Sequence, residues 1–172
     1  MKKILLLATI ALLFSVTSQA QQQKGNFLLG VGIGAGYYYA GGVPLMVSGE
    51  YCFTDNLSIG GYLGYTTWNH GYARGYDYKY TFIDFGARGS YHFNEVFGIT
   101  NKKVDVYGGG FLGFVSSSYS GNNNALYRDV YDGGVRAGIH AGARYYFAPR
   151  VAGYGELGVG YVPVSIGLTF KL

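Results

Sequence analysis

The sequence predicts an all-β chain that closes into an eight-stranded antiparallel up-and-down transmembrane β-barrel. Three observations predict this fold class. Eight segments alternate apolar with small or polar residues at the period of a β-strand, and no helical period appears after the N-terminal segment. Charged residues make up only 13% of the 172 residues, about half the share that is usual in soluble domains. Glycine and tyrosine are abundant, with 30 and 19 residues, whereas proline occurs three times.

The first twenty residues are predicted to be a cleaved secretory signal peptide, which leaves residues 21–172 as one barrel domain. Lys2 and Lys3 form a positive region, Ile4–Phe14 an apolar core, and Ser18–Ala20 a small-x-small cleavage site. The apolar core is too short to span a membrane. No later segment has eighteen continuous apolar residues, so only strands remain to cross a membrane.

Each of the eight predicted strands carries its apolar residues two positions apart. The strands are expected at Phe27–Tyr39, Leu45–Phe53, Leu57–Thr67, Tyr80–Phe93, Val104–Ser116, Val135–Phe147, Val151–Tyr161 and Val164–Leu172. Their apolar faces are, in order, Phe27, Leu29, Val31 and Ile33; Leu45, Val47, Tyr51 and Phe53; Leu57, Ile59, Leu63 and Tyr65; Ile83, Phe85, Ala87 and Tyr91; Val104, Val106, Leu112 and Phe114; Val135, Ala137, Ile139 and Ala141; Val151, Leu157, Val159 and Tyr161; and Val164, Ile166, Leu168 and Phe170.

The sixth strand, VRAGIHAGARYYF, indicates which face meets lipid. Its odd positions are apolar, and its even positions carry Arg136, His140 and Arg144 between glycines. A water-facing strand gains nothing from glycine, which weakens strands, whereas a narrow barrel interior needs small residues beside large ones. Aromatic residues near the ends of the apolar faces match the girdles of membrane barrels. We therefore expect lipid outside and the charges inside, and not a soluble β-sandwich.

Short and long connections alternate along the chain, as they do between the periplasmic turns and external loops of outer-membrane barrels. The short ones are Thr54–Asn56, Asn94–Lys102 and Ala148–Arg150, and the long ones are Trp68–Lys79 and Ser117–Asp132. Eight strands enclose only enough room for side chains to fill, which excludes a wide general pore.

The predicted inward charges form a candidate network in the lumen. Its members are Glu50, Asp84, Arg88, His92, Asp105, Arg136, His140, Arg144, Glu156 and Lys171. A charge in a poorly hydrated interior costs several kcal/mol unless it is paired. Because the arginine fork can bridge two carboxylates, we expect Arg136 and Arg144 to reach Glu156 and Asp105. The network then acts as a closed, charge-paired plug.

Two stretches carry a resemblance to a known family. They are SGEYCFTDNLSIGGYLGY (Ser48–Tyr65), a strand, tight turn and strand, and the ending SIGLTFKL (Ser165–Leu172). The mature chain resembles the small outer-membrane β-barrels of Gram-negative bacteria, the OmpX-like and OmpA-transmembrane-like proteins. The resemblance implies contact with outer-membrane lipid and lipopolysaccharide, insertion by the barrel-assembly machinery, and a role in adhesion, envelope integrity or binding of host proteins. The family's last strand ends in an aromatic residue, whereas this chain ends in Leu172, with Phe170 on the same face.

The external loops are the predicted contact surface, because tyrosine, tryptophan and arginine are favoured in such surfaces. The candidates are Trp68, His70, Tyr72, Arg74, Tyr76, Tyr119 and Arg128. The expected role is structural or adhesive and non-enzymatic. Two alternatives stay open: a narrow channel or carrier for small or apolar solutes, and a lipid-modifying enzyme. An acyl-transfer site would need a Ser–His pair, for which Ser90 and His92 share a predicted face.

Several other classes of function find no support in the sequence. The three histidines and the single cysteine, Cys52, have no metal-ligand spacing, so no metal or other cofactor is predicted. The net charge of +4 includes Lys2 and Lys3 of the predicted signal peptide, and no dense basic block suggests nucleic acid. GVGIGAG (Gly30–Gly36) places its glycines on alternate positions of a strand, which favours lumen packing over a dinucleotide site.

Overall fold

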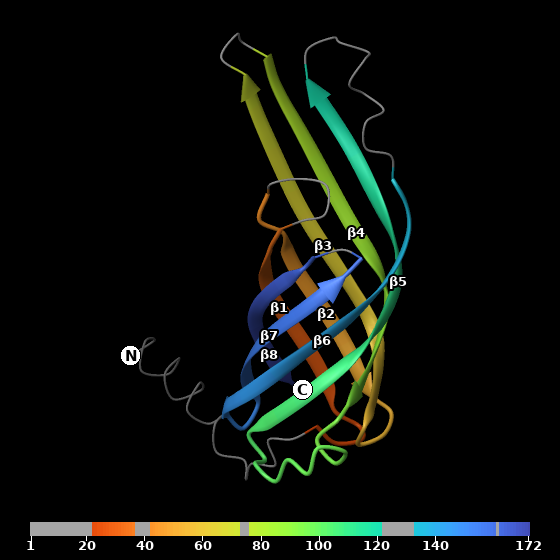
Figure 1. Cartoon of the computed structure of the whole chain (residues 1–172), viewed down its shortest axis with the longest axis vertical. Coiled ribbons are helices and arrows are strands. Elements are labelled where there is room, and N and C mark those ends of the chain that lie inside the picture. Colours follow the sequence, from red (N-terminus) through yellow and green to blue (C-terminus); the bar gives the residue numbers. More distant parts are fainter. Residues whose placement is uncertain (1–21, 37–41, 73–75, 122–132, 161) are drawn as a thin grey trace, which may run out of the picture.

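The computed structural model describes residues 22–36, 42–72, 76–121, 133–160 and 162–172. Eight strands form one closed barrel in chain order, each antiparallel to its neighbours (Figure 1). The strands are β1 (Phe27–Ala35), β2 (Leu45–Cys52), β3 (Leu57–Tyr72), β4 (Tyr76–His92), β5 (Val104–Gly121), β6 (Gly134–Ala148), β7 (Val151–Val159) and β8 (Val164–Lys171). The barrel closes between β1 and β8, from Leu28 opposite Lys171 to Ala35 opposite Val164. The predicted fold class is confirmed.

Among the described residues, no helix is long and apolar enough to cross a membrane. The predicted signal peptide lies outside the described residues, as do the last residues predicted for the first strand, 37–39.

An apolar band covers the outward face of the barrel. Every strand contributes to it, with Val31, Val47, Leu63, Phe85, Leu112, Ile139, Leu157 and Ile166 as exposed examples, one from each of β1 to β8. At the end with the short turns, Tyr51 packs edge-on against Phe53 at 5.0 Å between ring centroids, and Tyr91 against Phe93 at 4.9 Å. So large an exposed apolar surface, bordered by aromatic residues, is typical of a lipid-facing band.

Three strands run well beyond the other five at the opposite end (Figure 1). β3 and β4 pair as far as Tyr72 opposite Tyr76, and β4 pairs with β5 as far as Gly121. Among the described residues, β2 pairs with β3 only as far as Tyr65, and β6 with β5 only as far as Val115. We call this part of β3, β4 and β5, beyond Tyr65 and Val115, the outer sheet.

The outer sheet corrects the prediction of two long loops. Most of Trp68–Lys79 is a paired hairpin, and Ser117–Gly121 continues β5. The outward face of β5 changes from Phe114 to Ser116 and then Ser118, so the apolar alternation stops while backbone pairing continues. Tyrosine, threonine and tryptophan favour strands without needing a buried apolar face.

The interior has a polar half near the short turns and an apolar half near the outer sheet. The apolar half is a buried cluster of Met46, Tyr62, Tyr80, Phe82, Phe111, Val115 and Val162. Inward glycines make room for the large side chains. A Cβ on Gly142, for example, would lie 2.6 Å from the hydroxyl oxygen of Tyr107, so only glycine fits there beside the ring.

Candidate functional site

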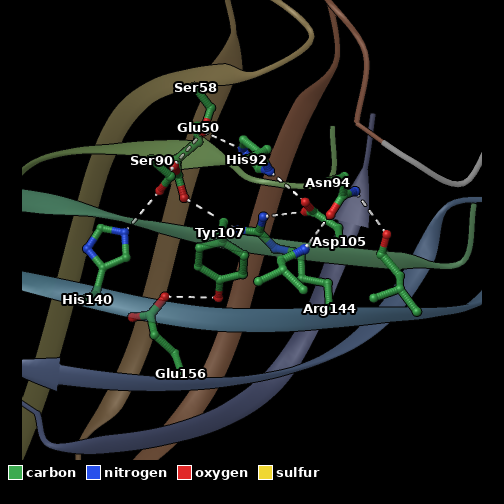
Figure 2. Close-up of polar contacts among 12 residues, drawn as sticks. Glu50, Ser58, Ser90, His92, Asn94, Asp105, Tyr107, His140, Arg144 and Glu156 are labelled. Carbon is green, nitrogen blue, oxygen red and sulfur yellow. Dashed lines mark hydrogen bonds and ion pairs between the residues drawn. The ribbon is translucent and has the colours of Figure 1, made fainter. Parts of the chain in front are cut away.

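The polar half of the lumen holds one connected network of buried side chains (Figure 2). Each member has at most 6% of its surface exposed, and strands β2 to β7 all contribute. We call it the lumen network, and its members are Glu50, Ser58, Arg88, Ser90, His92, Asp105, Tyr107, His140, Arg144 and Glu156. The strand alternation that points apolar residues outward places all of them inside.

Arg88 joins two acids from different walls of the barrel. Its Nη2 lies 2.8 Å from Oε2 of Glu156, and its Nε lies 3.1 Å from Oε1 of Glu50. The hydroxyl of Tyr107 donates a further hydrogen bond to Oε2 of Glu156 at 3.0 Å. Arg88 therefore links β2, β4 and β7 through the centre of the lumen.

Arg144 forms the second bridge of the network. Its Nη1 donates to Oδ2 of Asp105 at 2.9 Å, and its Nη2 lies 3.6 Å from Oε1 of Glu50. The guanidinium carbon stands 3.9 Å from the ring centroid of Tyr107, which is a cation–π contact. A desolvated guanidinium held by two carboxylates and an aromatic face has little freedom to move.

A chain of hydrogen bonds connects the two bridges to both lumen histidines (Figure 2). Nδ1 of His92 lies 2.7 Å from Oδ1 of Asp105, and its Nε2 lies 3.1 Å from Oγ of Ser58. Ser58 and Ser90 both donate to Oε2 of Glu50, at 2.8 and 2.6 Å. Nε2 of His140 lies 3.0 Å from Oγ of Ser90.

The contacts from Ser58 to His92 and from His92 to Asp105 have the order of a hydrolytic triad. The surroundings of Ser58, however, do not suit a nucleophile. Ser58 is fully buried, and its hydroxyl proton points to Glu50 and not to His92. A nucleophilic serine must reach its substrate and pass its proton to the histidine. The Ser90–His92 pair considered from the sequence does not form, because Ser90 contacts His140.

Three further predicted lumen charges are Asp84, Arg136 and Lys171. Asp84 is buried in the apolar half, where its Oδ1 accepts a hydrogen bond from Tyr62 at 3.0 Å. Arg136 and Lys171 are half-buried, and Nζ of Lys171 lies 5.5 Å from the ring centroid of Tyr146. Arg144 meets Asp105, as expected, whereas Glu156 is bound by Arg88 of β4, a partner that was not predicted.

The external candidates are only partly within the described structure. Trp68 is half-buried and stacks on Tyr80 at 6.2 Å between ring centroids, so it packs against the apolar cluster instead of standing free in a loop. The backbones of His70, Tyr72, Tyr76 and Tyr119 belong to the outer sheet. Arg74 and Arg128 lie outside the described residues.

The sequence did not single out Ser58 as a member of the network, and it predicted Tyr107 and Tyr62 as lumen residues without their partners, Glu156 and Asp84. Their inward position follows from strand alternation. Their partners depend on the register between strands, which the sequence does not reveal.

Side chains fill the lumen at the level of the arginines. The cavity beside Arg88, Tyr107, Arg144 and Glu156 has a volume of about 10 Å³, which is about the room that one water molecule needs. No group of three or more possible metal ligands occurs among the described residues. The network can therefore lock the strands together.

No family model matches the sequence, and no curated protein is significantly similar to it. Solved structures are similar in fold. OprG from Pseudomonas aeruginosa superposes with a TM-score of 0.62 at 11% identity, covering 89% of this chain and 98% of that one. Ail, the attachment invasion locus protein of Yersinia pestis, was solved in complex with the heparin analogue sucrose octasulfate. It superposes with a TM-score of 0.53 at 13% identity, covering 87% of this chain and 100% of that one. Neisserial surface protein A superposes with a TM-score of 0.53 at 19% identity, covering 86% of this chain and 96% of that one.

This chain has the fold of the small outer-membrane β-barrels. The resemblance inferred from Ser48–Tyr65 and from the C-terminal strand is confirmed at the level of fold. Because the identities lie between 11% and 19%, the role of this barrel has to be argued from its own surfaces.

Proposed function

We propose that this chain is a non-enzymatic barrel of the outer membrane, exported by a signal peptide at residues 1–20. In this proposal the closed lumen serves stability, and the outer sheet makes the contacts with other molecules. The observation that carries the proposal is the combination of a lumen filled by ion pairs with a sheet that extends past the apolar band.

The boundary of the apolar band supports an extracellular position for the outer sheet. The last apolar outward residues are Tyr65 on β3, Ile83 on β4 and Phe114 on β5. Tyr65 is paired with Ile83, and Ile83 with Ser116, so the change to polar residues on the three strands falls within one outward residue of the same height. A sheet that turns polar at one level on three strands is expected to leave the membrane there.

The outward face of the last part of β5 is a suitable contact element. In the described part of the chain, β6 pairs with β5 only as far as Val115, whereas β5 continues to Gly121. Ser116, Ser118 and Ser120 face outward with small exposed side chains. Such an outward face, with small side chains, can lie against the surface of a partner molecule. The association of Ail with a heparin analogue supports testing a sulfated polysaccharide as a second kind of partner.

A shortened hairpin tests the contact role. Residues 70–78 are replaced by Asn-Gly, which joins the paired residues Asn69 and Lys79 by a two-residue turn and keeps the Trp68–Tyr80 stack. Bacteria that display either protein are compared for adherence to an epithelial monolayer and to immobilised heparin. We expect at least a tenfold loss with the shortened hairpin on one of these surfaces, while heat-resistant gel migration shows that the barrel still folds. Unchanged adherence on both surfaces would contradict the contact role.

Export and location are tested separately. N-terminal sequencing of the protein from purified outer membranes should begin at Gln21. A chain that keeps Lys2 and Lys3, or one that fractionates with soluble proteins, would contradict this part of the proposal.

The apolar half of the lumen favours a carrier for small apolar solutes as a second candidate function. Met46, Phe82 and Phe111 belong to the buried cluster nearest the outer sheet. A carrier should bind a fluorescent apolar probe such as N-phenylnaphthylamine, and Phe111→Asp should abolish that binding. Binding that survives Phe111→Asp, or no binding at all, leaves the contact role as the better account.

A further inference from the structure

Ser58 shows where a proton of the lumen network must lie. Its hydroxyl carries one proton, and Oγ lies 2.8 Å from Oε2 of Glu50 and 3.1 Å from Nε2 of His92. Glu50 stands beside the guanidiniums of Arg88 and Arg144 and acts only as an acceptor. Two oxygens 2.8 Å apart would repel each other without a proton between them, so the hydroxyl proton of Ser58 belongs to the bond with Glu50.

His92 then has two acceptors and no donor around its ring. Oγ of Ser58 has already given its proton, so Nε2 of His92 must donate to it. The other ring nitrogen, Nδ1, lies 2.7 Å from a carboxylate oxygen of Asp105, which also only accepts. An imidazole that donates from both nitrogens carries two protons and a positive charge.

The charges of the network lead to the same conclusion. Three carboxylates, Glu50, Asp105 and Glu156, are paired with two guanidiniums, Arg88 and Arg144. A buried cluster with one uncompensated negative charge would be costly. A doubly protonated His92 is the third cation and brings the cluster to neutrality.

We propose that His92 is a proton-binding site that completes the charge balance of the closed lumen and that exchanges its proton at the end of the barrel with the short turns. A cavity of about 260 Å³ lies at that end, and His92 is the one member of the lumen network that lines it. The proton can therefore reach His92 without passing the arginine bridges.

Charged and titratable groups surround His92 from several elements. They are Asp105 and Tyr107 of β5, Glu50 and Cys52 of β2, Arg144 of β6, Lys171 of β8 at the same end, and Asp55, Glu95 and Lys102 around the cavity. Loss of the proton from His92 would break its bond to Ser58 and leave the cluster with a net negative charge. The closed lumen is then held most firmly while both ring nitrogens of His92 carry a proton.

His140 provides a control within the same molecule. It also contacts a serine whose proton points to Glu50, so Nε2 of His140 donates to Ser90. No carboxylate lies opposite its other nitrogen among the hydrogen bonds of the network. One proton satisfies the contact of His140 with Ser90, and a neutral ring is compatible with it.

Nitrogen NMR of the histidine rings tests the proposal directly. The refolded barrel is labelled with ¹⁵N-histidine in micelles at pH 8, where imidazole in water is mostly neutral. The chain has three histidines, so spectra of His70→Gln and His92→Gln identify the signals of His70 and His92, and the remaining signal belongs to His140. We expect two protonated nitrogens for His92 and one for His140. A neutral ring at His92 under these conditions would overturn the proposal.

The pH dependence of unfolding provides a second readout. The unfolding temperature should fall by roughly 3 °C or more between pH 6 and pH 9, and this fall should vanish in His92→Gln but persist in His140→Gln. Glu156 does not touch His92, yet Glu156→Gln should destabilise the His92→Gln variant less than it destabilises the native protein, because it removes the surplus negative charge. Equal pH dependence in both histidine variants, or purely additive effects with Glu156→Gln, would contradict a charge-balancing role. This outcome is independent of the contact role of the outer sheet.

Discussion

Arg88 on β4 and Glu156 on β7 are joined by two hydrogen bonds through the lumen, Nη2 to Oε2 at 2.8 Å and Nη1 to Oε1 at 3.4 Å. The two strands belong to different walls of the barrel and have no backbone pairing with each other. The guanidinium also contacts Glu50 of β2, so the side chain of Arg88 connects three strands, β2, β4 and β7. A small number of buried ion pairs therefore joins strands on opposite sides of the lumen.

Glu156→Gln tests how much this bridge stabilises the barrel. The substitution keeps the shape of the side chain but leaves the buried guanidinium of Arg88 with Glu50 as its acidic partner. Removal of one partner of a buried pair typically costs about 3 to 5 kcal/mol, and we expect a value near the lower limit because Glu50 remains. Urea unfolding in lipid vesicles measures the change. Glu95→Gln at an exposed turn is the control, with an expected change of at most about 0.5 kcal/mol; equal effects would show that the bridge has no special role.

A pair of glycines tests the packing of the lumen. A Cβ on Gly142 would lie 2.6 Å from the hydroxyl oxygen and 2.7 Å from Cζ of Tyr107, whereas a Cβ on Gly155 would meet nothing within 4 Å. Gly142→Ala should therefore destabilise the barrel by about 1 to 3 kcal/mol. Gly155→Ala on the outward face should be neutral or stabilising by about 0.5 kcal/mol. The stabilities of the two variants are compared by their unfolding midpoints in urea. An unchanged midpoint in Gly142→Ala would indicate that the lumen is loosely packed.

The position of the lipid is tested by placing a lysine on the outward face at two heights. Ile139 is 65% exposed in the apolar band, and a lysine there should cost about 2 to 4 kcal/mol in a bilayer. Ser118 faces outward on the outer sheet, beyond the band, and Ser118→Lys should be tolerated. The two variants are compared by their folding yields and unfolding midpoints in phosphatidylcholine vesicles. If Ile139→Lys were as stable as Ser118→Lys, the band would not face lipid.

Much of the fold could be predicted from the sequence because lipid and lumen impose opposite demands on alternate residues. The period of two over segments such as Val135–Phe147 determined which side chains point inward. The ends of β3, β4 and β5 could not be predicted in the same way. Beyond Tyr65 and Phe114 both faces of the sheet lose the contrast between lipid and lumen, and the outward residues become serine and threonine.

The partners within the lumen were harder to predict than its members. Glu50, Arg88, Asp105, Arg144 and Glu156 were expected to point inward, and the structure places them there. Which carboxylate meets which guanidinium depends on contacts across the lumen, which have no regular spacing in the sequence. Long arginine side chains cross the interior, so Arg88 of β4 meets Glu156 of β7 although the strands between them supply nearer cations.

Single-channel conductance of the purified, refolded barrel in a planar phosphatidylcholine bilayer tests the central claim of a closed lumen most directly. With Arg88 and Arg144 bridging the acids and a cavity of about 10 Å³ beside them, the native protein should show no steady openings at neutral pH. Insertion is verified in the same preparation by heat-resistant gel migration. Silence from inserted protein is the predicted result, whereas reproducible openings of uniform size would contradict the plug and identify the lumen charges as the lining of a channel.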